Sequence, residues 1–325
     1  MFSYLFRLVC LSLACFFLAN LMFTMVVALL APVVIRLAGR IRPRRAASLL
    51  FAIRMAPLGL SAILVIGLCI PSYLELEPDT TVEPVGFACL SAAMLGALMW
   101  SVSIVRASRS VLRSLRYVRE CELAASKTLL AGDPAPVWVV DGMAPLIALA
   151  GIVRSRLVIS RSVIRVLSTG QLTAALRHER AHQAARDNVK RMAMVLAPDA
   201  FPFAHAFSTI DKAWARFTEW AADDWAVGGN PEVSLSLATA LVRVARISSS
   251  ATIVPLVSTF HANGNDLSER VNRLLRAASE RPKPEAQRPA MLAAATLTLA
   301  TCAATVLLQP GLQSAVHTVL ERLVR

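Results

Sequence analysis

Four long apolar stretches constrain the fold of this chain more than any other feature. They cover about residues 8–35, 55–73, 85–105 and 291–308, and each can cross the hydrocarbon core of a bilayer as a helix. Hydrophobic residues make up 56% of the 325 residues, which exceeds the share typical of soluble domains. The sequence therefore predicts a mainly α-helical, multi-pass membrane protein with four transmembrane helices.

The distribution of charge between these stretches predicts their orientation. The first stretch lacks the basic start of a signal peptide and is longer than a signal's apolar region, so we interpret it as a span. Arginines follow the first and third spans, at 36–45 and 106–119, whereas the connection at 75–83 carries only acidic charges. Because basic residues gather on the cytoplasmic side, we expect residues 106–288 in the cytoplasm of a bacterial plasma membrane. The N-terminus and the C-terminal tail would then lie outside.

Small residues recur every four positions in the third span. Ala88, Ala92 and Gly96 would form a stripe along one helix face. Such stripes let another membrane helix approach closely. We therefore expect the third span to pack tightly against another span of the same chain.

The segment His-Glu-Arg-Ala-His at 178–182 carries the main chemical signal. Residues four apart share one face of a helix, so His178 and His182 can bind a single metal ion, as in many zinc sites. Glu179 is turned about 100° from His178, so its carboxylate can reach a water molecule without being a ligand. The motif predicts a catalytic site with one Zn²⁺ ion. The competing interpretation is a surface helix that holds these residues by chance.

The flanking sequence places this motif inside a helix. Ser168 and Gln171 have the spacing of a capping box, and no Pro or Gly follows until about Leu196. We therefore predict one helix from Ser168 to about Leu196, with the histidines near its middle.

Two histidines leave a catalytic zinc ion one protein ligand short. A second predicted helix, closed by Gly228 and Gly229, carries Glu219 and Asp223 four residues apart on one face. We predict Glu219 as the third ligand, and Asp223 as the acceptor of the free N–H of a ligating imidazole. A solvated acidic face is the alternative for this pair. The competing third ligands are His205, Asp224 and His261.

Together these residues resemble a known pattern. His178-Glu179-x-x-His182 followed by Glu219-x-x-x-Asp223 is similar to the gluzincin pattern of the HtpX and CAAX-prenyl endopeptidases and of the BlaR/MecR-type membrane metallopeptidases. The resemblance implies that both histidines and Glu219 bind zinc, that Glu179 acts as general base and that Asp223 orients a ligand.

Further segments are similar to the BlaR/MecR-type proteins, namely 186–188, 222–226 and 269–275. Those receptors carry a penicillin-binding sensor domain after their last membrane helix. The tail of this chain, residues 309–325, contains no Ser-x-x-Lys nucleophile motif of such a domain. We therefore expect no direct antibiotic sensing, and a separate sensor or regulator protein as a partner.

These signals divide the chain into three predicted regions. Residues 1–105 hold three spans, residues 106–288 form a cytoplasmic α+β zincin-like metallopeptidase domain, and residues 289–325 hold the fourth span and a short outer tail. Residues 137–140 and 156–160 have the composition of strands. Between them, 146–150 is a candidate edge strand, whose residues Ala148, Leu149 and Ala150 would hold an extended substrate by strand addition. A buried central strand is the alternative.

One more histidine falls in the predicted domain. His261 is a candidate for stabilising the transition state, and a lone surface histidine is the competing interpretation. Asn230 and Pro231 predict the start of an apolar helix that ends near Ile247.

The predicted function is a membrane-anchored zinc endopeptidase that cleaves a protein or peptide substrate on the cytoplasmic side, in signal transduction or regulated proteolysis. The net charge of +13 suggests nucleic acid, but the arginines crowd the membrane edges, so membrane lipid is the expected partner and nucleic acid is not. The alternatives are an HtpX-like quality-control protease and a non-catalytic signalling scaffold that retains a zinc site.

Overall fold

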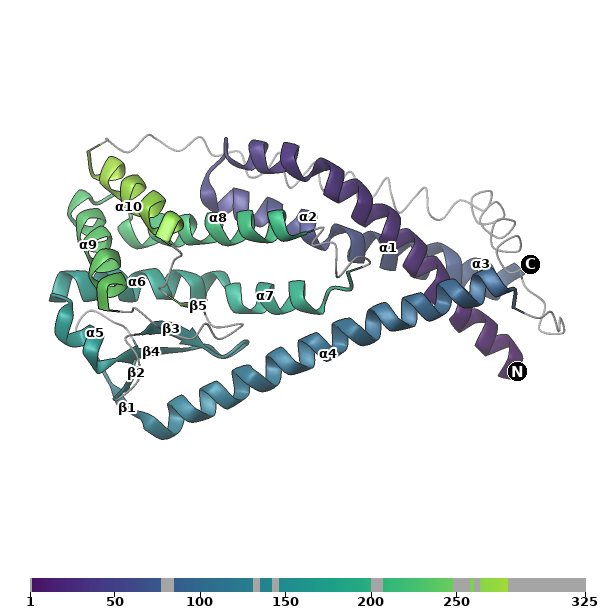
Figure 1. The fold of residues 1–325 in the computed structure, drawn as a ribbon, viewed down its shortest axis with the longest axis horizontal. Helices are drawn as coiled ribbons and strands as arrows, with labels where there is room; N and C mark the ends of the chain where they lie inside the picture. Colours follow the sequence, from purple (N-terminus) through teal and green to yellow (C-terminus); the bar gives the residue numbers. More distant parts are fainter. Residues whose placement is uncertain are drawn as a thin grey trace.

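The computed structural model describes residues 2–76, 85–130, 135–141, 146–199, 207–247, 258–259 and 264–279. Figure 1 shows an elongated molecule, with a bundle of long helices at one end and a small sheet with shorter helices at the other. The predicted fourth span, residues 291–308, lies outside the described residues.

Among the described residues, three helical segments are long and apolar enough to cross a membrane. They are α1 (Phe2–Ala38), α2 (Pro43–Leu64) with its continuation through a π-helical turn (Val65–Cys69) into α3 (Ile70–Leu76), and α4 (Phe87–Ala124). Many of their large apolar side chains are exposed, such as Leu29 at 76%. Contiguous exposed apolar surface of this kind is typical of a lipid-facing bundle. The first three predicted spans are thus found as apolar helices.

Helices α1 and α4 approach each other closely within this bundle. A Cβ atom on Gly96 would lie only 2.7 Å from the carbonyl oxygen of Leu13, so a larger residue would push the helices apart. The close packing predicted for the small-residue stripe is confirmed at Gly96. Leu11 and Phe16 of α1 and Met99 of α4 belong to the buried cluster at this contact.

Helix α4 continues far beyond its apolar part. It crosses the predicted domain boundary at residue 105 without a break and ends at Ala124, where β1 begins. Tyr117 and Cys121 near its end pack on one face of the sheet, against Trp138 and Val158. A single helix therefore connects the membrane bundle to the sheet, as Figure 1 shows along its lower edge.

The sheet contains five strands among the described residues. They are β1 (Ala125–Thr128), β2 (Val137–Val140), β3 (Ile147–Ala150), β4 (Arg156–Ser160) and β5 (Ser258–Thr259), in the spatial order β1-β2-β4-β3-β5. The pairing of β2 with β4 is parallel, and the other pairings are antiparallel. The strands predicted at 137–140, 146–150 and 156–160 are confirmed.

The prediction that residues 146–150 form an edge strand is wrong. Strand β3 lies between β4 and β5, with Ala148 opposite Thr259 and Leu149 opposite Ser258. Every residue of β3 is buried. Strand β5 pairs with part of the side of β3 that an added substrate strand would need. The proposed role of Ala148, Leu149 and Ala150 in strand addition is therefore no longer supported.

Six further helices complete the described part of the domain. They are α5 (Arg161–Val166), α6 (Thr169–Ala185), α7 (Asp187–Leu196), α8 (Ser208–Val227), α9 (Pro231–Ile247) and α10 (Gly264–Ser279). The main core joins the second face of the sheet to α6, α9 and α10, through residues such as Leu149, Leu176, Leu241 and Leu274. The predicted helix from Pro231 to Ile247 is confirmed.

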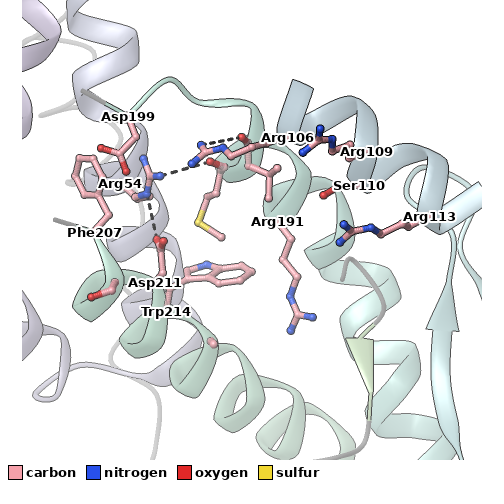
Figure 2. Close-up of a pocket in the computed structure, with 14 residues that line it drawn as sticks. Arg54, Arg106, Arg109, Ser110, Arg113, Arg191, Asp199, Phe207, Asp211 and Trp214 are labelled. Atoms are coloured by element: carbon pink, nitrogen blue, oxygen red, sulfur yellow. Dashed lines mark hydrogen bonds and ion pairs between the residues drawn. The ribbon is translucent and has the colours of Figure 1, made fainter. Parts of the chain in front are cut away.

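Helix α8 also packs against the membrane bundle. Ile210 and Phe217 of α8 share a buried cluster with Leu50 of α2. Nearby, Arg54 of α2 donates a hydrogen bond from Nε to Asp211 Oδ1 of α8 at 3.1 Å. A cavity lies at this junction, where α2, α4, α7 and α8 meet (Figure 2).

Candidate metal centre

Helix α6 buries the three residues of the predicted zinc motif. Its start has the predicted capping box: the Ser168 N–H donates to Gln171 Oε1 at 3.1 Å, and the Gln171 N–H donates to Ser168 Oγ at 3.5 Å. His178, Glu179 and His182 are each at most 1% exposed. This burial excludes the surface-helix interpretation.

The helix ends earlier than predicted. Arg186 adopts a left-handed conformation, with φ 55° and ψ 41°, and α7 starts at Asp187. In an unbroken helix Asp187 would point about 140° away from His182. The break instead brings Asp187 Oδ2 to 2.8 Å from His182 Nδ1. Beside it, Asn188 Nδ2 donates to the backbone oxygens of Leu149 and Gly151, which anchors the break to β3.

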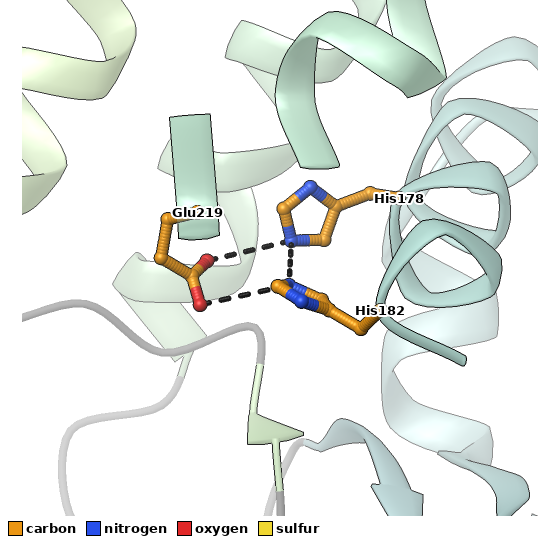
Figure 3. A group of neighbouring side chains, drawn as sticks. All are labelled: His178, His182 and Glu219. Atoms are coloured by element: carbon orange, nitrogen blue, oxygen red, sulfur yellow. Dashed lines mark hydrogen bonds and ion pairs between the residues drawn. The ribbon is translucent and has the colours of Figure 1, made fainter. Parts of the chain in front are cut away.

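Helix α8 brings a carboxylate to the two imidazoles (Figure 3). Glu219 Oε2 lies 3.5 Å from His178 Nε2, and Glu219 Oε1 lies 3.5 Å from His182 Nε2. The two Nε2 atoms are 3.1 Å apart. One ligand atom of each residue lies within 4.8 Å of the others.

A second set of carboxylates holds the outer nitrogens of both rings. Asp223 Oδ1 lies 2.9 Å from His178 Nδ1, and Asp187 Oδ2 lies on the corresponding side of His182. A carboxylate at Nδ1 keeps the proton on that nitrogen and leaves the Nε2 lone pair for a metal. Asp223 therefore lies where the sequence predicted, whereas the contact of Asp187 was not foreseen.

Arg270 of α10 connects the two acids of α8. Its guanidinium donates from Nε and Nη2 to Asp223, at 2.9 and 2.7 Å, and its Nη1 lies 2.9 Å from Glu219 Oε2. Arg270 is only 2% exposed. The resemblance suggests a structural or transition-state group near Arg270, but the sequence could not identify its partners, since they lie about 50 residues earlier.

The site holds four buried or largely buried carboxylates, those of Glu179, Asp187, Glu219 and Asp223. They outnumber the permanent cations that contact them, which are Arg270 at Glu219 and Asp223 and Lys190 at Asp187. Burial alone would raise the pKa of Asp223, but the charge of Arg270 and the contact with His178 hold it at about 2. Burial opposes charge on His182 as well, yet the charge of Glu219 and the hydrogen bond to Asp187 raise its pKa to about 10. The site therefore favours added positive charge, which a divalent cation would supply.

Glu179 differs from the other acids of the site, because its carboxylate has no hydrogen-bond partner among the described residues. Both carboxylate oxygens are buried, and neither has a hydrogen-bond partner among the described residues. This burial raises the pKa of Glu179 to about 7. A buried carboxylate without partners is costly to stability, so its presence points to a ligand or a reacting group that it serves.

The ligand atoms fit a zinc ion. Two ligands bound at about 2.1 Å to tetrahedral zinc lie roughly 3.4 Å apart, and two imidazoles with one carboxylate are a common catalytic set. The distances of 3.1, 3.5 and 3.5 Å are close to this value. The residues present are therefore compatible with one catalytic zinc ion and an open fourth position.

Of the competing third ligands, only Asp224 lies in the described residues, and it is not part of this cluster. Asp224 is 49% exposed and accepts two hydrogen bonds from Arg273 Nη2, at 2.7 and 2.8 Å. His205 and His261 lie outside the described residues, so the proposed role of His261 in the transition state stays a prediction.

The contact between Asp187 and His182 gives the first testable prediction. Asp187→Ala is expected to weaken zinc binding by about 10- to 100-fold, because the imidazole loses the carboxylate that orients it. The affinity is measured by competition with a chromogenic chelator. Glu232→Ala, which removes an exposed acid at the start of α9, is the control and should leave the affinity unchanged. Equal affinity in the two variants would contradict this role.

Comparisons with known proteins add one finding. The profile of peptidase family M48 matches residues 116–278, about half of the chain. The matched segment runs from the last turns of α4 to the end of α10 and contains every residue of the site described above. No curated protein matches the chain.

Proposed function

The chain belongs to peptidase family M48, and from this membership and the geometry of its site we propose that it is a membrane-anchored, zinc-dependent endopeptidase. The observation that carries the proposal is the buried carboxylate of Glu179, which has no hydrogen-bond partner in the described part of the chain. It lies beside the converging ligand atoms of His178, His182 and Glu219. The family match supports a peptidase. It does not extend to the more specific resemblance to BlaR/MecR-type receptors.

The proposed mechanism follows from the roles of the side chains. His178, His182 and Glu219 would hold the zinc ion, which would supply Lewis-acid chemistry to the scissile carbonyl and to a water molecule. Glu179 is placed to accept a proton from the attacking water and to deliver it to the leaving amine. Burial favours this role, because a carboxyl group with a pKa near 7 both accepts and returns a proton near neutral pH.

The proposed zinc set is tested by metal analysis of the purified protein. Wild-type protein is expected to hold about one zinc ion per chain and to cleave an unstructured protein substrate. Glu219→Ala is expected to lose most of the zinc and all measurable cleavage. Asp224→Ala removes the neighbouring, exposed acid and should keep both. A Glu219→Ala protein with full zinc content and activity would exclude Glu219 as a ligand.

The same experiment separates the enzyme from a non-catalytic scaffold. A scaffold would bind zinc in wild-type protein and lose it in Glu219→Ala, but it would cleave no substrate in either form. The buried Glu179 argues against this alternative, because a structural zinc site has no use for a general base.

We also propose that the site faces the cytoplasm. This orientation is supported by the arginines that follow the first and third apolar stretches. Lys127→Cys introduces a thiol at an exposed position of β1. In intact cells, this thiol is expected to resist a membrane-impermeant reagent until the membrane is permeabilised. Glu75→Cys introduces a thiol at an exposed position near the end of α3, and this thiol should react in intact cells. The reverse pattern of labelling would place the domain outside.

A further inference from the structure

The cavity at the junction of the membrane bundle and the peptidase domain has no role in the proposed chemistry. Its volume is about 610 Å³, within the range of small-molecule sites. Residues of α2, α4, α7 and α8 line it (Figure 2). The cavity therefore lies between parts of the chain that are far apart in sequence.

Positive charge dominates the lining. Five arginines and two aspartates border the cavity, an excess of three positive charges; they are Arg54, Arg106, Arg109, Arg113, Arg191, Asp199 and Asp211. Arg54 is neutralised by Asp211 at 3.1 Å. Arg109 and Arg113 are exposed and make no hydrogen bond or ion pair with another described residue. Their charges are therefore available to an anion.

The arginines of α4 follow directly after its uncharged apolar part. Residues 85–105 carry no charge, and Arg106 is the first charged residue after them. At 1.5 Å per residue, Arg109 lies about 5 Å and Arg113 about 10 Å further along the helix. The headgroup region extends roughly 5–8 Å beyond the hydrocarbon core on each side. The charged lining thus begins where the phosphates of a bilayer would be.

A buried donor in the lining provides an independent observation. Trp214 is 2% exposed, and its indole Nε1 has no hydrogen-bond partner among the described residues. Figure 2 shows the indole among the residues that surround the cavity, opposite the arginines of α4. An indole N–H can only donate, so it needs an acceptor from outside the described residues. An oxygen-rich anion in the cavity would supply one.

We propose that this cavity binds the phosphate of an anionic phospholipid such as phosphatidylglycerol, with Arg109, Arg113 and the Trp214 N–H as donors. Guanidinium groups match phosphate oxygens in two-point hydrogen bonds. A free phosphate ion has the same chemistry, but the position at the end of an apolar span favours the lipid. Trp214 lies on α8, five residues before Glu219, so a bound lipid would fasten the helix of the proposed third ligand to α4.

The test compares two charge-matched double variants of the full-length protein in detergent. Binding of dioctanoyl phosphatidylglycerol is measured by microscale thermophoresis at fixed ionic strength, with dioctanoyl phosphatidylcholine as the neutral lipid. Arg109→Gln with Arg113→Gln is expected to weaken phosphatidylglycerol binding by about tenfold or more. Arg116→Gln with Arg119→Gln alters two exposed arginines of the same helix that do not line the cavity, and should change binding by less than about twofold.

Several outcomes would overturn the proposal. Equal losses in the two double variants would show general attraction to a basic helix, and equal affinity for the two lipids would exclude recognition of the headgroup charge. Inorganic phosphate that binds as tightly as phosphatidylglycerol would identify a soluble anion as the ligand. Trp214→Phe keeps the ring and removes the donor, and unchanged binding in this variant would exclude the indole contact. The measurement needs no peptidase activity, so it stands or fails separately from the proposed function.

Discussion

Glu179→Gln is expected to lower the rate of peptide cleavage by roughly 10²- to 10⁴-fold while the protein still binds one zinc ion. Glutamine keeps the shape of the side chain but cannot accept the proton of the attacking water. The variant should also be at least as resistant to thermal unfolding as wild-type protein. The reason is that both oxygens of Glu179 are buried without a partner among the described residues, and a neutral amide is less costly to bury there.

The measurements for this variant are cleavage rate, zinc content and the midpoint of thermal unfolding. Glu232→Gln, an exposed acid on α9, is the matched control and should change none of the three. Cleavage by Glu179→Gln at the wild-type rate would show that another group moves the proton. Loss of zinc together with activity would instead make Glu179 part of the metal site.

The second large effect concerns Arg270. Arg270→Met is expected to reduce the free energy of unfolding by about 3–5 kcal/mol, because it leaves the carboxylates of Asp223 and Glu219 without their buried counter-charge. Arg270 is 2% exposed and contacts both acids at 2.7–2.9 Å. The loss should be largest in protein freed of metal by a chelator, since the metal ion then no longer adds positive charge beside Glu219.

Arg273, one turn further along α10, provides a matched control. It pairs with Asp224, but the two side chains are 27% and 49% exposed. Arg273→Met should therefore cost only about 0–1 kcal/mol, as is typical of surface ion pairs. Denaturant unfolding of chelated protein in detergent compares the two variants. Similar stabilities for Arg270→Met and Arg273→Met would show that the buried guanidinium does not stabilise the acids of α8.

Much of the candidate site was predictable because it depends on spacing along single helices. The four-residue interval places His178 and His182 on one face, and the same interval places Glu219 and Asp223 on one face of α8. The capping box at Ser168 was also predictable, because it needs only two residues three positions apart. These features follow from the periodicity of the helix and need no knowledge of the rest of the fold.

The break at Arg186 shows where such reasoning fails. No Gly or Pro marks it, and the left-handed conformation is found at an arginine. The hydrogen bonds from Asn188 to the backbone of Leu149 and Gly151 anchor the chain at this point. A contact with a strand almost 40 residues earlier thus accompanies the turn that brings Asp187 to His182.

The edge strand was mispredicted for a related reason. Strand β5 has only two residues, Ser258 and Thr259, and two residues carry no recognisable alternation. Its pairing with β3 joins segments more than 100 residues apart. The sequence identified β3 as a strand but had no means of locating its neighbours.

The sequence by itself determined the first three apolar spans, the helix with both histidines and the pair of acids that faces them, because each depends on residues close together in the chain. Only the tertiary structure decided that Arg270 joins the acids of α8, that Asp187 holds His182, and that arginines of α2, α4 and α7 border one cavity. Those contacts join residues on different helices. Their formation depends on how the helices pack, which local patterns do not encode.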